Sequence, residues 1–130
     1  LVESFCQRLR VPKVHRELAL AVTRDHLNVH RARELRPKTL LALLERLRGL
    51  RKGEFFLHAL DACRCDALGR DGHADDAYPQ RAYLQQAAQV ASEITVRDLP
   101  GDLEGAAIGE ALAKARVARL TDWKRGQPLS

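Results

Sequence analysis

The sequence predicts an all-α protein, built as an array of short helices. Apolar residues recur three or four positions apart over nearly the whole chain, and no alternating strand pattern persists. Proline and glycine interrupt the pattern at intervals, as they do at helix ends. The 130 residues are 45% hydrophobic, enough for one domain with a core. No apolar run approaches the roughly 20 residues that a membrane helix needs.

Three helices are expected in the first part of the chain. Apolar spacing predicts the first over residues 1–9 and the second from Lys13 to about Arg33. Pro12 and Pro37 stand where a helix tolerates a residue without an amide hydrogen, so the third helix opens at Pro37. The inward residues of the second helix are Val14, Leu18, Ala21, Val22 and Val29, and those of the third are Leu40, Leu43, Leu44 and Leu47.

Three more helices are expected after a turn that Gly49 and Gly53 bracket. They cover about 54–68, 79–92 and 105–123, and polar loops at 69–78 and 97–104 separate them. Only "EITVRDL" at 93–99 hints at a strand. The inward rows are Phe56, Leu60, Cys63 and Ala67, then Leu84, Ala87, Ala88 and Ala91, and finally Ile108, Leu112, Ala115 and Arg119 with Leu120 and Trp123 nearby.

The net charge of the chain is compatible with nucleic-acid binding but does not prove it. The net charge is +5 and comes mostly from arginine, which favours a polyanionic partner such as nucleic acid. An ordinary solvated surface explains the same composition equally well. No GxxxxGK[ST], GxGxxG or HExxH motif occurs, which excludes P-loop nucleotide binding and HExxH zinc proteases.

Two acidic residues lie on faces that should point inward. Asp25 falls in the apolar stripe of the second helix, and Asp66 continues the row Phe55, Ala59 and Ala62. A buried carboxylate must be paired or hydrogen-bonded. We interpret Asp25 as a buried, paired acid, and we pair Asp66 with Arg70, four residues later. A metal or phosphate site at Asp66 remains the alternative.

The stretch "DHLNVHR" raises the question of a metal site. His26 and His30 are four residues apart, so a helix would place both imidazoles on one face. Two histidines do not complete a catalytic metal site, and partly exposed surface histidines are the simpler interpretation. Cys63 and Cys65 are two apart and would diverge on a helix, which argues against zinc there. Three cysteines without framework spacing indicate a reducing, cytoplasmic compartment.

An ordered series of motifs resembles a known family. The series is "VP" at 11–12, histidines at 26 and 30, "LRPKTL" at 35–40, "D-x-x-GR-x-G" at 66–72, "YPQ" at 78–80 and "G-x-x-IGEAL" at 105–112. In this order the motifs resemble the C-terminal half of bacterial CCA-adding enzymes, the tRNA nucleotidyltransferases. The chain begins at Leu1 and contains no methionine, so we expect it to be a fragment of such an enzyme.

The resemblance implies a division of the chain and a function. Residues 1–36 would be the C-terminal part of an HD-type domain, and residues 37–130 the helical body and tail that bind tRNA. The family adds CCA to tRNA 3′ ends from CTP and ATP with Mg²⁺. Its HD domain is a phosphohydrolase that uses a divalent metal. The nucleotidyltransferase site, and with it the contacts to CTP and ATP, would lie in a missing N-terminal domain, so no catalytic residue is expected here.

The resemblance makes His26 the leading metal ligand of the HD domain, followed by His30, although we expect no metal bound in this fragment. We expect a monomer or homodimer without membrane contact. Arg64, Cys65 and Glu104 depart from the family pattern, and Glu104 removes a positive charge before Gly105. An HD phosphohydrolase fragment and a plain helical interaction module remain the alternatives. The residues expected to bind tRNA are Arg31, Arg33, Lys38, Arg70, Arg116, Arg119, Lys124 and Arg125.

Overall fold

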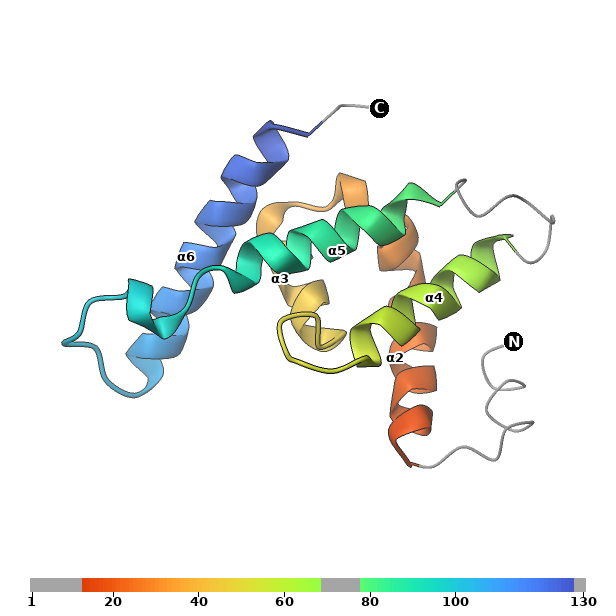
Figure 1. The fold of residues 1–130 in the computed structure, drawn as a ribbon, viewed down its shortest axis with the longest axis horizontal. Helices are drawn as coiled ribbons and strands as arrows, with labels where there is room; N and C mark the ends of the chain where they lie inside the picture. Colours follow the sequence, from red (N-terminus) through yellow and green to blue (C-terminus); the bar gives the residue numbers. More distant parts are fainter. Residues whose placement is uncertain (1–12, 69–77, 128–130) are drawn as a thin grey trace.

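The computed structural model describes residues 13–68 and 78–127. They form the helices α2 (Lys13–His30), α3 (Pro37–Arg46), α4 (Phe55–Leu68), α5 (Pro79–Ser92) and α6 (Ala106–Arg125), with short 3-10 helices η1 (Ala32–Glu34) and η3 (Val96–Asp98) (Figure 1). These ranges contain no strand, which confirms the all-α prediction. The helix predicted at residues 1–9 and the side chain of Val14 lie outside the described part.

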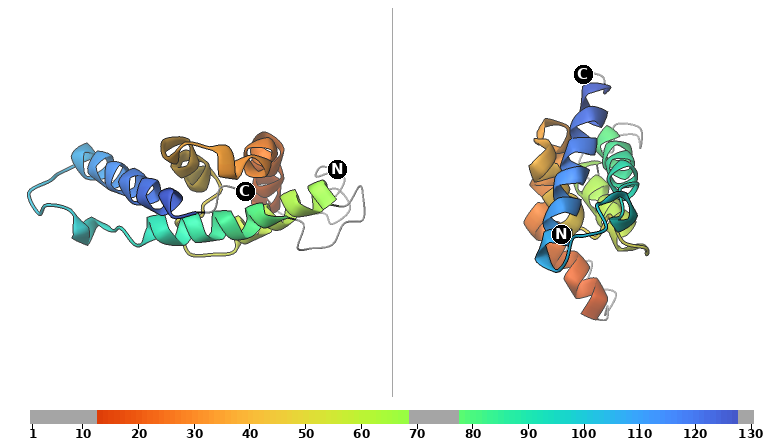
Figure 2. Two further views of the ribbon diagram at one scale, coloured as in Figure 1. Left: turned by 90° about the horizontal axis from the view of Figure 1, so that it is seen from above. Right: turned by 90° about the vertical axis from the view of Figure 1, so that its left-hand side faces the viewer.

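The helices pack in two layers around a core rich in leucine and alanine. Viewed from above, α6, α3 and α2 lie in one layer and α5 and α4 in the other (Figure 2, left). Helix α5 contacts α6, α4, η1, α2 and α3, so it connects the two ends of the molecule. The largest fully buried apolar side chains are Leu40, Leu43, Leu44, Leu47, Leu60, Leu84, Leu120, Val22 and Val29.

Proline sets the start of two helices, as the sequence predicts. Pro37 and Pro79 occupy the first turns of α3 and α5. Arg36, which precedes Pro37, is extended, with φ −68° and ψ 153°. Because the residue before proline avoids the helical region, the chain must leave the helix earlier. Helix α2 ends earlier still, at His30, a few residues before the predicted end, and η1 follows it.

The turn after α3 is bracketed by Gly49 and Gly53, as the sequence predicts. Positive φ angles occur at Arg48, with φ 59°, and at Gly53, with φ 124°. The Gly49 amide donates to Leu44 O at 2.7 Å and the Arg48 amide to Glu45 O at 3.1 Å, which is the pattern of a Schellman cap. Gly49 is needed for space instead, because a Cβ there would lie 3.1 Å from the ring of Phe56.

Helix α6 packs through a different face from the predicted one. Its one buried residue is Leu120, and Ala113, Val117 and Trp123 pack beside it against the core. Ile108 is only half-buried and does not join this cluster. Successive residues are rotated by roughly 100°, so a row chosen one position too early faces away from the core. The inward row predicted for α6 is therefore wrong, except for Leu120 and Trp123.

The segment "EITVRDL" forms a 3-10 turn instead of a strand. Thr95 and Asp98 make a capping box at η3, in which the Thr95 amide donates to Asp98 Oδ2 at 2.8 Å. Among the described helices, none combines the length and the apolar character needed to cross a bilayer.

Candidate functional site

Cations from two distant segments of the chain meet where the last turn of α6 contacts η1. The Lys124 ammonium donates to Arg33 O at 3.1 Å, across 91 residues of sequence. The side chains of Arg31 and Arg125 are 70% and 77% exposed. Helix α3, which begins just after η1, also contacts α6. We call the cations around η1, at the start of α3 and at the end of α6 the basic edge; its members are Arg31, Arg33, Arg36, Lys38, Lys124 and Arg125.

Sequence reasoning missed Arg36, although it lies within "LRPKTL" next to Lys38. Both side chains are exposed, and they flank Pro37 at the start of α3. Neither makes a hydrogen bond or ion pair with the residues in 13–68 and 78–127. The sequence signal that could have identified Arg36 is its place directly before Pro37 and two residues from Lys38.

Acidic neighbours moderate the charge of the basic edge only slightly. Arg31 Nε lies 4.0 Å from Glu34 Oε2, and Arg125 Nη1 lies 3.6 Å from Asp122 Oδ1. All four side chains are at least 70% exposed. Solvent-exposed pairs of this kind contribute about 0–1 kcal/mol, so a phosphate can replace the acid as partner.

Lys124 has a structural task as well as its predicted contact with RNA. Its ammonium donates to Tyr83 Oη at 3.1 Å as well as to Arg33 O, and it lies 5.7 Å from the Tyr83 ring centroid. Tyr83 in turn packs on Trp123 with centroids 4.8 Å apart. Lys124 thus anchors the end of α6 to η1 and α5. Because its ammonium is engaged in these contacts, it is less available to a phosphate than the exposed cations of the basic edge.

Two other predicted cations lie apart from the basic edge. Arg116 Nε donates to Ile94 O at 3.2 Å, and Arg119 Nη2 pairs with Glu93 Oε1 at 3.1 Å. Both arginines join α6 to the segment that follows α5. The structure therefore does not gather all the predicted RNA-binding residues on one surface. Arg70, and with it the predicted Asp66–Arg70 pair, lies outside the described residues.

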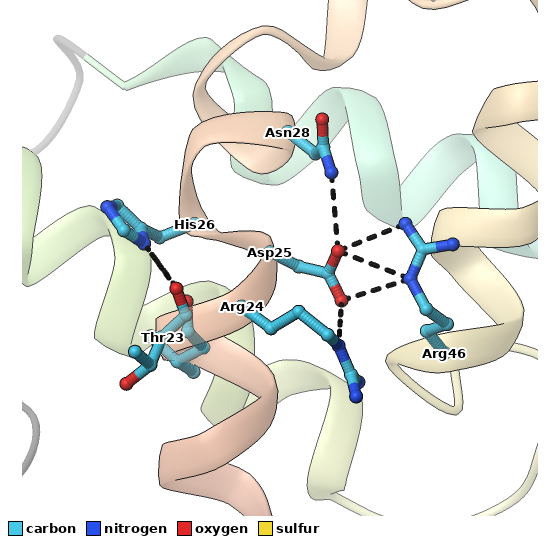
Figure 3. Close-up of polar contacts among 7 residues, drawn as sticks. Thr23, Arg24, Asp25, His26, Asn28 and Arg46 are labelled. Atoms are coloured by element: carbon cyan, nitrogen blue, oxygen red, sulfur yellow. Dashed lines mark hydrogen bonds and ion pairs between the residues drawn. The ribbon is translucent and has the colours of Figure 1, made fainter.

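Asp25 is the buried, paired acid that its position in the stripe predicts. Only 2% of its side chain is exposed, and Arg46 contacts both of its oxygens at 3.0–3.2 Å (Figure 3). Arg24 Nε and Asn28 Nδ2 donate to it at 3.2 and 3.3 Å. Burial raises the pKa of Asp25, but the hydrogen bonds from Arg46, Asn28 and Arg24 and the charge of Arg46 hold it below 3.8. Asp25 therefore carries a satisfied charge and is no free metal ligand.

His26 keeps one nitrogen available for a ligand. Its Nδ1 lies 3.0 Å from Thr23 O and 3.2 Å from Val22 O (Figure 3). A carbonyl oxygen can only accept, so Nδ1 carries the hydrogen and the lone pair of the neutral ring is on Nε2. A backbone carbonyl that fixes the other nitrogen is typical of histidines that bind metals.

His30 is more fully engaged. Its Nδ1 lies 2.6 Å from Tyr78 Oη, and its Nε2 lies 3.7 Å from Asp66 Oδ2. The two histidine rings meet edge to face with centroids 5.8 Å apart. Within residues 13–68 and 78–127, no three His, Cys, Asp or Glu side chains are placed to hold a metal ion. The described residues therefore do not form a complete metal site.

The two helical cysteines face different environments, as their spacing predicts. Cys63 is buried and Cys65 exposed. Burial, with the charges of Asp66 and Asp25, raises the pKa of Cys63 to about 12. Cys63 is therefore an inert core thiol.

Comparison with known proteins identifies relatives over nearly the whole chain. This chain is 44% identical over 123 residues to the multifunctional CCA protein of Acinetobacter baumannii. It is 42% identical over 124 residues to that of Acinetobacter baylyi and 45% identical over 121 residues to that of Xanthomonas oryzae pv. oryzae. The matches cover 92–95% of this chain but 30% of each relative. No family model and no solved structure matches the chain. The resemblance expected from the motifs is confirmed, for a chain that spans 30% of the length of these relatives.

Proposed function

We infer that this chain, a relative of the multifunctional CCA proteins, is the helical part of such an enzyme that holds tRNA while CCA is added to its 3′ end. The basic edge is the observation that carries this inference. It gathers exposed cations from the residues that flank η1, from the start of α3 and from the end of α6, which is far away in sequence, on a scaffold with a well-packed core.

Spaced cations on a rigid surface suit a folded RNA. Double-stranded RNA is recognised mainly through its shape and phosphates, which requires no base-reading residues. Among the described aromatic residues, Phe56 and Tyr78 are buried, and Tyr83 and Trp123 pack on each other. Phe55 is half-buried, and the Arg48 guanidinium lies 4.1 Å from its ring centroid. These residues therefore offer no platform for stacking single-stranded bases. The chemistry therefore favours the helical parts of tRNA over its single-stranded 3′ end.

Salt-dependent tRNA binding by the 130-residue chain tests this function. Arg31, Arg36, Lys38 and Arg125 are exposed at the basic edge, so log K should fall with log salt at a slope of roughly −3 to −4. Changing Arg36→Gln and Lys38→Gln together should weaken binding and reduce the slope by about 2. The control is Arg51→Gln with Lys52→Gln, an adjacent exposed pair beyond the opposite end of α3.

A flat salt response, or equal losses in the test and control variants, would contradict binding at the basic edge. Absence of binding at micromolar protein would favour the plain helical interaction module. CTP and ATP would enter only through the N-terminal domain of the longer enzyme, with Mg²⁺ serving nucleotidyl transfer there. We expect the enzyme to act in the cytoplasm as a monomer or homodimer.

A second function, metal-dependent phosphohydrolysis, is favoured by the open Nε2 of His26. A divalent ion bound there would polarise a phosphoester, with its other ligands supplied from outside the described residues. In the longer enzyme, His26→Ala should lower phosphohydrolase activity and leave CCA addition intact. His58→Ala, which changes an exposed histidine of α4, is the control. Loss of CCA addition by folded His26→Ala enzyme would contradict this division of labour.

We propose that residues 1–36 belong functionally to the HD-type part and residues 37–130 to the tRNA-binding part. The described residues of both parts nevertheless share one core. Arg46 pairs with Asp25 across this boundary, and Gln80 Nε2 donates to His30 O at 2.9 Å. The two functions would therefore meet in one packed body instead of being joined by a linker.

A further inference from the structure

His30 is held on three sides by side chains from α4 and the start of α5. Tyr78 Oη lies 2.6 Å from its Nδ1, and Asp66 Oδ2 lies 3.7 Å from its Nε2. Gln80 Nε2 donates to the His30 carbonyl at 2.9 Å. That carbonyl belongs to the last residue of α2 and has no partner within its own helix. Both ring nitrogens and the carbonyl of His30 therefore face groups brought by later parts of the chain.

The chemistry of these neighbours decides where the His30 hydrogen lies. A carboxylate only accepts, so the Asp66 charge favours the hydrogen on the nitrogen that faces it, Nε2. Nδ1 then has a lone pair and accepts the Tyr78 hydroxyl. Tyr78 can donate this hydrogen bond, because burial, with the charge of Asp66, raises its pKa and keeps the phenol protonated.

We propose that Tyr78 and Asp66 are positioning residues that hold His30 in the Nε2–H tautomer. His30 then packs beside His26 with a fixed ring orientation and does not act as a second metal ligand. A nitrogen that bears a hydrogen has no lone pair for a metal. The His30 ring meets the His26 ring edge to face, at 80°, which limits the orientations of the His26 ring. The importance of His26 rests on the proposed phosphohydrolase function, whereas the tautomer of His30 does not.

The same contacts give the "YPQ" motif a physical meaning. Pro79 begins α5, and its two neighbours, Tyr78 and Gln80, both bind His30. The tripeptide therefore starts one helix and clamps the end of another in the same turn. Tyr78 is 7% exposed, so its hydroxyl has little access to water as a competing partner.

Histidine side-chain NMR on the ¹⁵N-labelled 130-residue chain tests the proposal. At about pH 8.5, roughly two units above the ordinary histidine pKa, the nitrogen shifts report which nitrogen bears the hydrogen. The chain has five histidines, and His30→Gln identifies the signals of His30. We expect a single Nε2–H form in the unmodified protein.

Two variants test the two halves of the clamp. Tyr78→Phe should move the Nδ1 resonance of His30 to that of a nitrogen without a hydrogen-bond donor, and Asp66→Asn should increase the Nδ1–H form. Tyr83→Phe is the matched control, because the Tyr83 hydroxyl binds Lys124 and should leave His30 unchanged. Unchanged His30 resonances in folded Tyr78→Phe protein would overturn the proposal.

Two measurements need no variant. An Nδ1–H form of His30 in the unmodified protein would overturn the proposal even if Tyr78→Phe fails to fold. Zinc chloride added to the labelled chain should leave the His30 Nε2–H in place, and its displacement by zinc would equally overturn the proposal. Neither readout involves RNA or phosphoester hydrolysis, so failure of the proposed function would leave these results standing.

Discussion

Replacement of Arg46 should destabilise the protein, because the buried charge of Asp25 would lose its main partner. Replacing one partner of a buried ion pair typically costs roughly 3–5 kcal/mol, because the other charge is left without compensation. Here Arg24 and Asn28 would still contact the carboxylate, and the Arg46 side chain is 38% exposed. We therefore expect Arg46→Met to lower the free energy of unfolding by about 2–3 kcal/mol at neutral pH.

The effect of Arg46→Met should depend on pH in a defined direction. The pKa of Asp25 lies below 3.8 in the folded protein, so its stabilising contribution is present above pH 3.8 and is lost as the pH falls through the folded value. Arg46 lowers the pKa of Asp25, and burial raises it. In the Arg46→Met protein, the effect of burial is less opposed, so the pKa of Asp25 rises. The difference between the two proteins should therefore be largest at neutral pH and should shrink in acid.

Urea unfolding followed by circular dichroism measures these differences across pH. Arg24→Met is the matched control, since Arg24 makes a single contact of 3.2 Å with Asp25 and is 60% exposed. It should cost no more than about 1 kcal/mol. The reasoning is refuted if Arg46→Met costs as little as the control, or if its cost does not diminish in acid.

Three further outcomes follow from burial and contacts. Leu44→Ala, at a fully buried position, should cost about 2–5 kcal/mol in urea unfolding, whereas Leu20→Ala, at a position 68% exposed, should stay within about 0.5 kcal/mol; similar costs at both sites would contradict the core. Lys124→Met should cost about 1–3 kcal/mol, because it leaves two oxygen acceptors without a donor, and an unchanged melting temperature would refute this anchor. At pH 8, a thiol reagent should modify Cys65 in the folded protein and spare Cys63, whose pKa is raised to about 12; mass spectrometry after digestion would detect the opposite result.

Local patterns in the sequence were enough to predict most of the fold. Prolines marked the starts of α3 and α5, and leucines three or four apart identified the buried face of α3. The prediction of the inward face of α6 was wrong because small alanines and arginines are interspersed along this helix and mark no clear apolar side. With few large apolar residues, packing against α3 and α5 decides the orientation of α6, and the local sequence does not record that packing.

The candidate site was predictable in kind but not in its partners. The burial of Asp25 followed from its place in an apolar stripe, yet its main partner, Arg46, lies 21 residues away. Likewise the two histidines were evident at once, but Tyr78 lies 48 residues from His30. Sequence spacing reveals pairs within one helix, whereas pairs between helices depend on how the helices pack. For the same reason, spacing does not reveal the contact between Lys124 and Arg33 O, which joins residues 91 apart in the sequence.

The one-sided anchoring of α6 has a consequence for hydrogen exchange. Its single buried residue, Leu120, and the Lys124 contacts lie in the C-terminal half, while the residues of the first turn, from Ala106 to Gly109, are exposed or half-buried. Local opening requires little free energy where few contacts must break. Amide hydrogens should therefore exchange rapidly near the start of α6 and much more slowly around Leu120. Protection from deuterium would rise along a single helix, although its backbone geometry is regular from end to end.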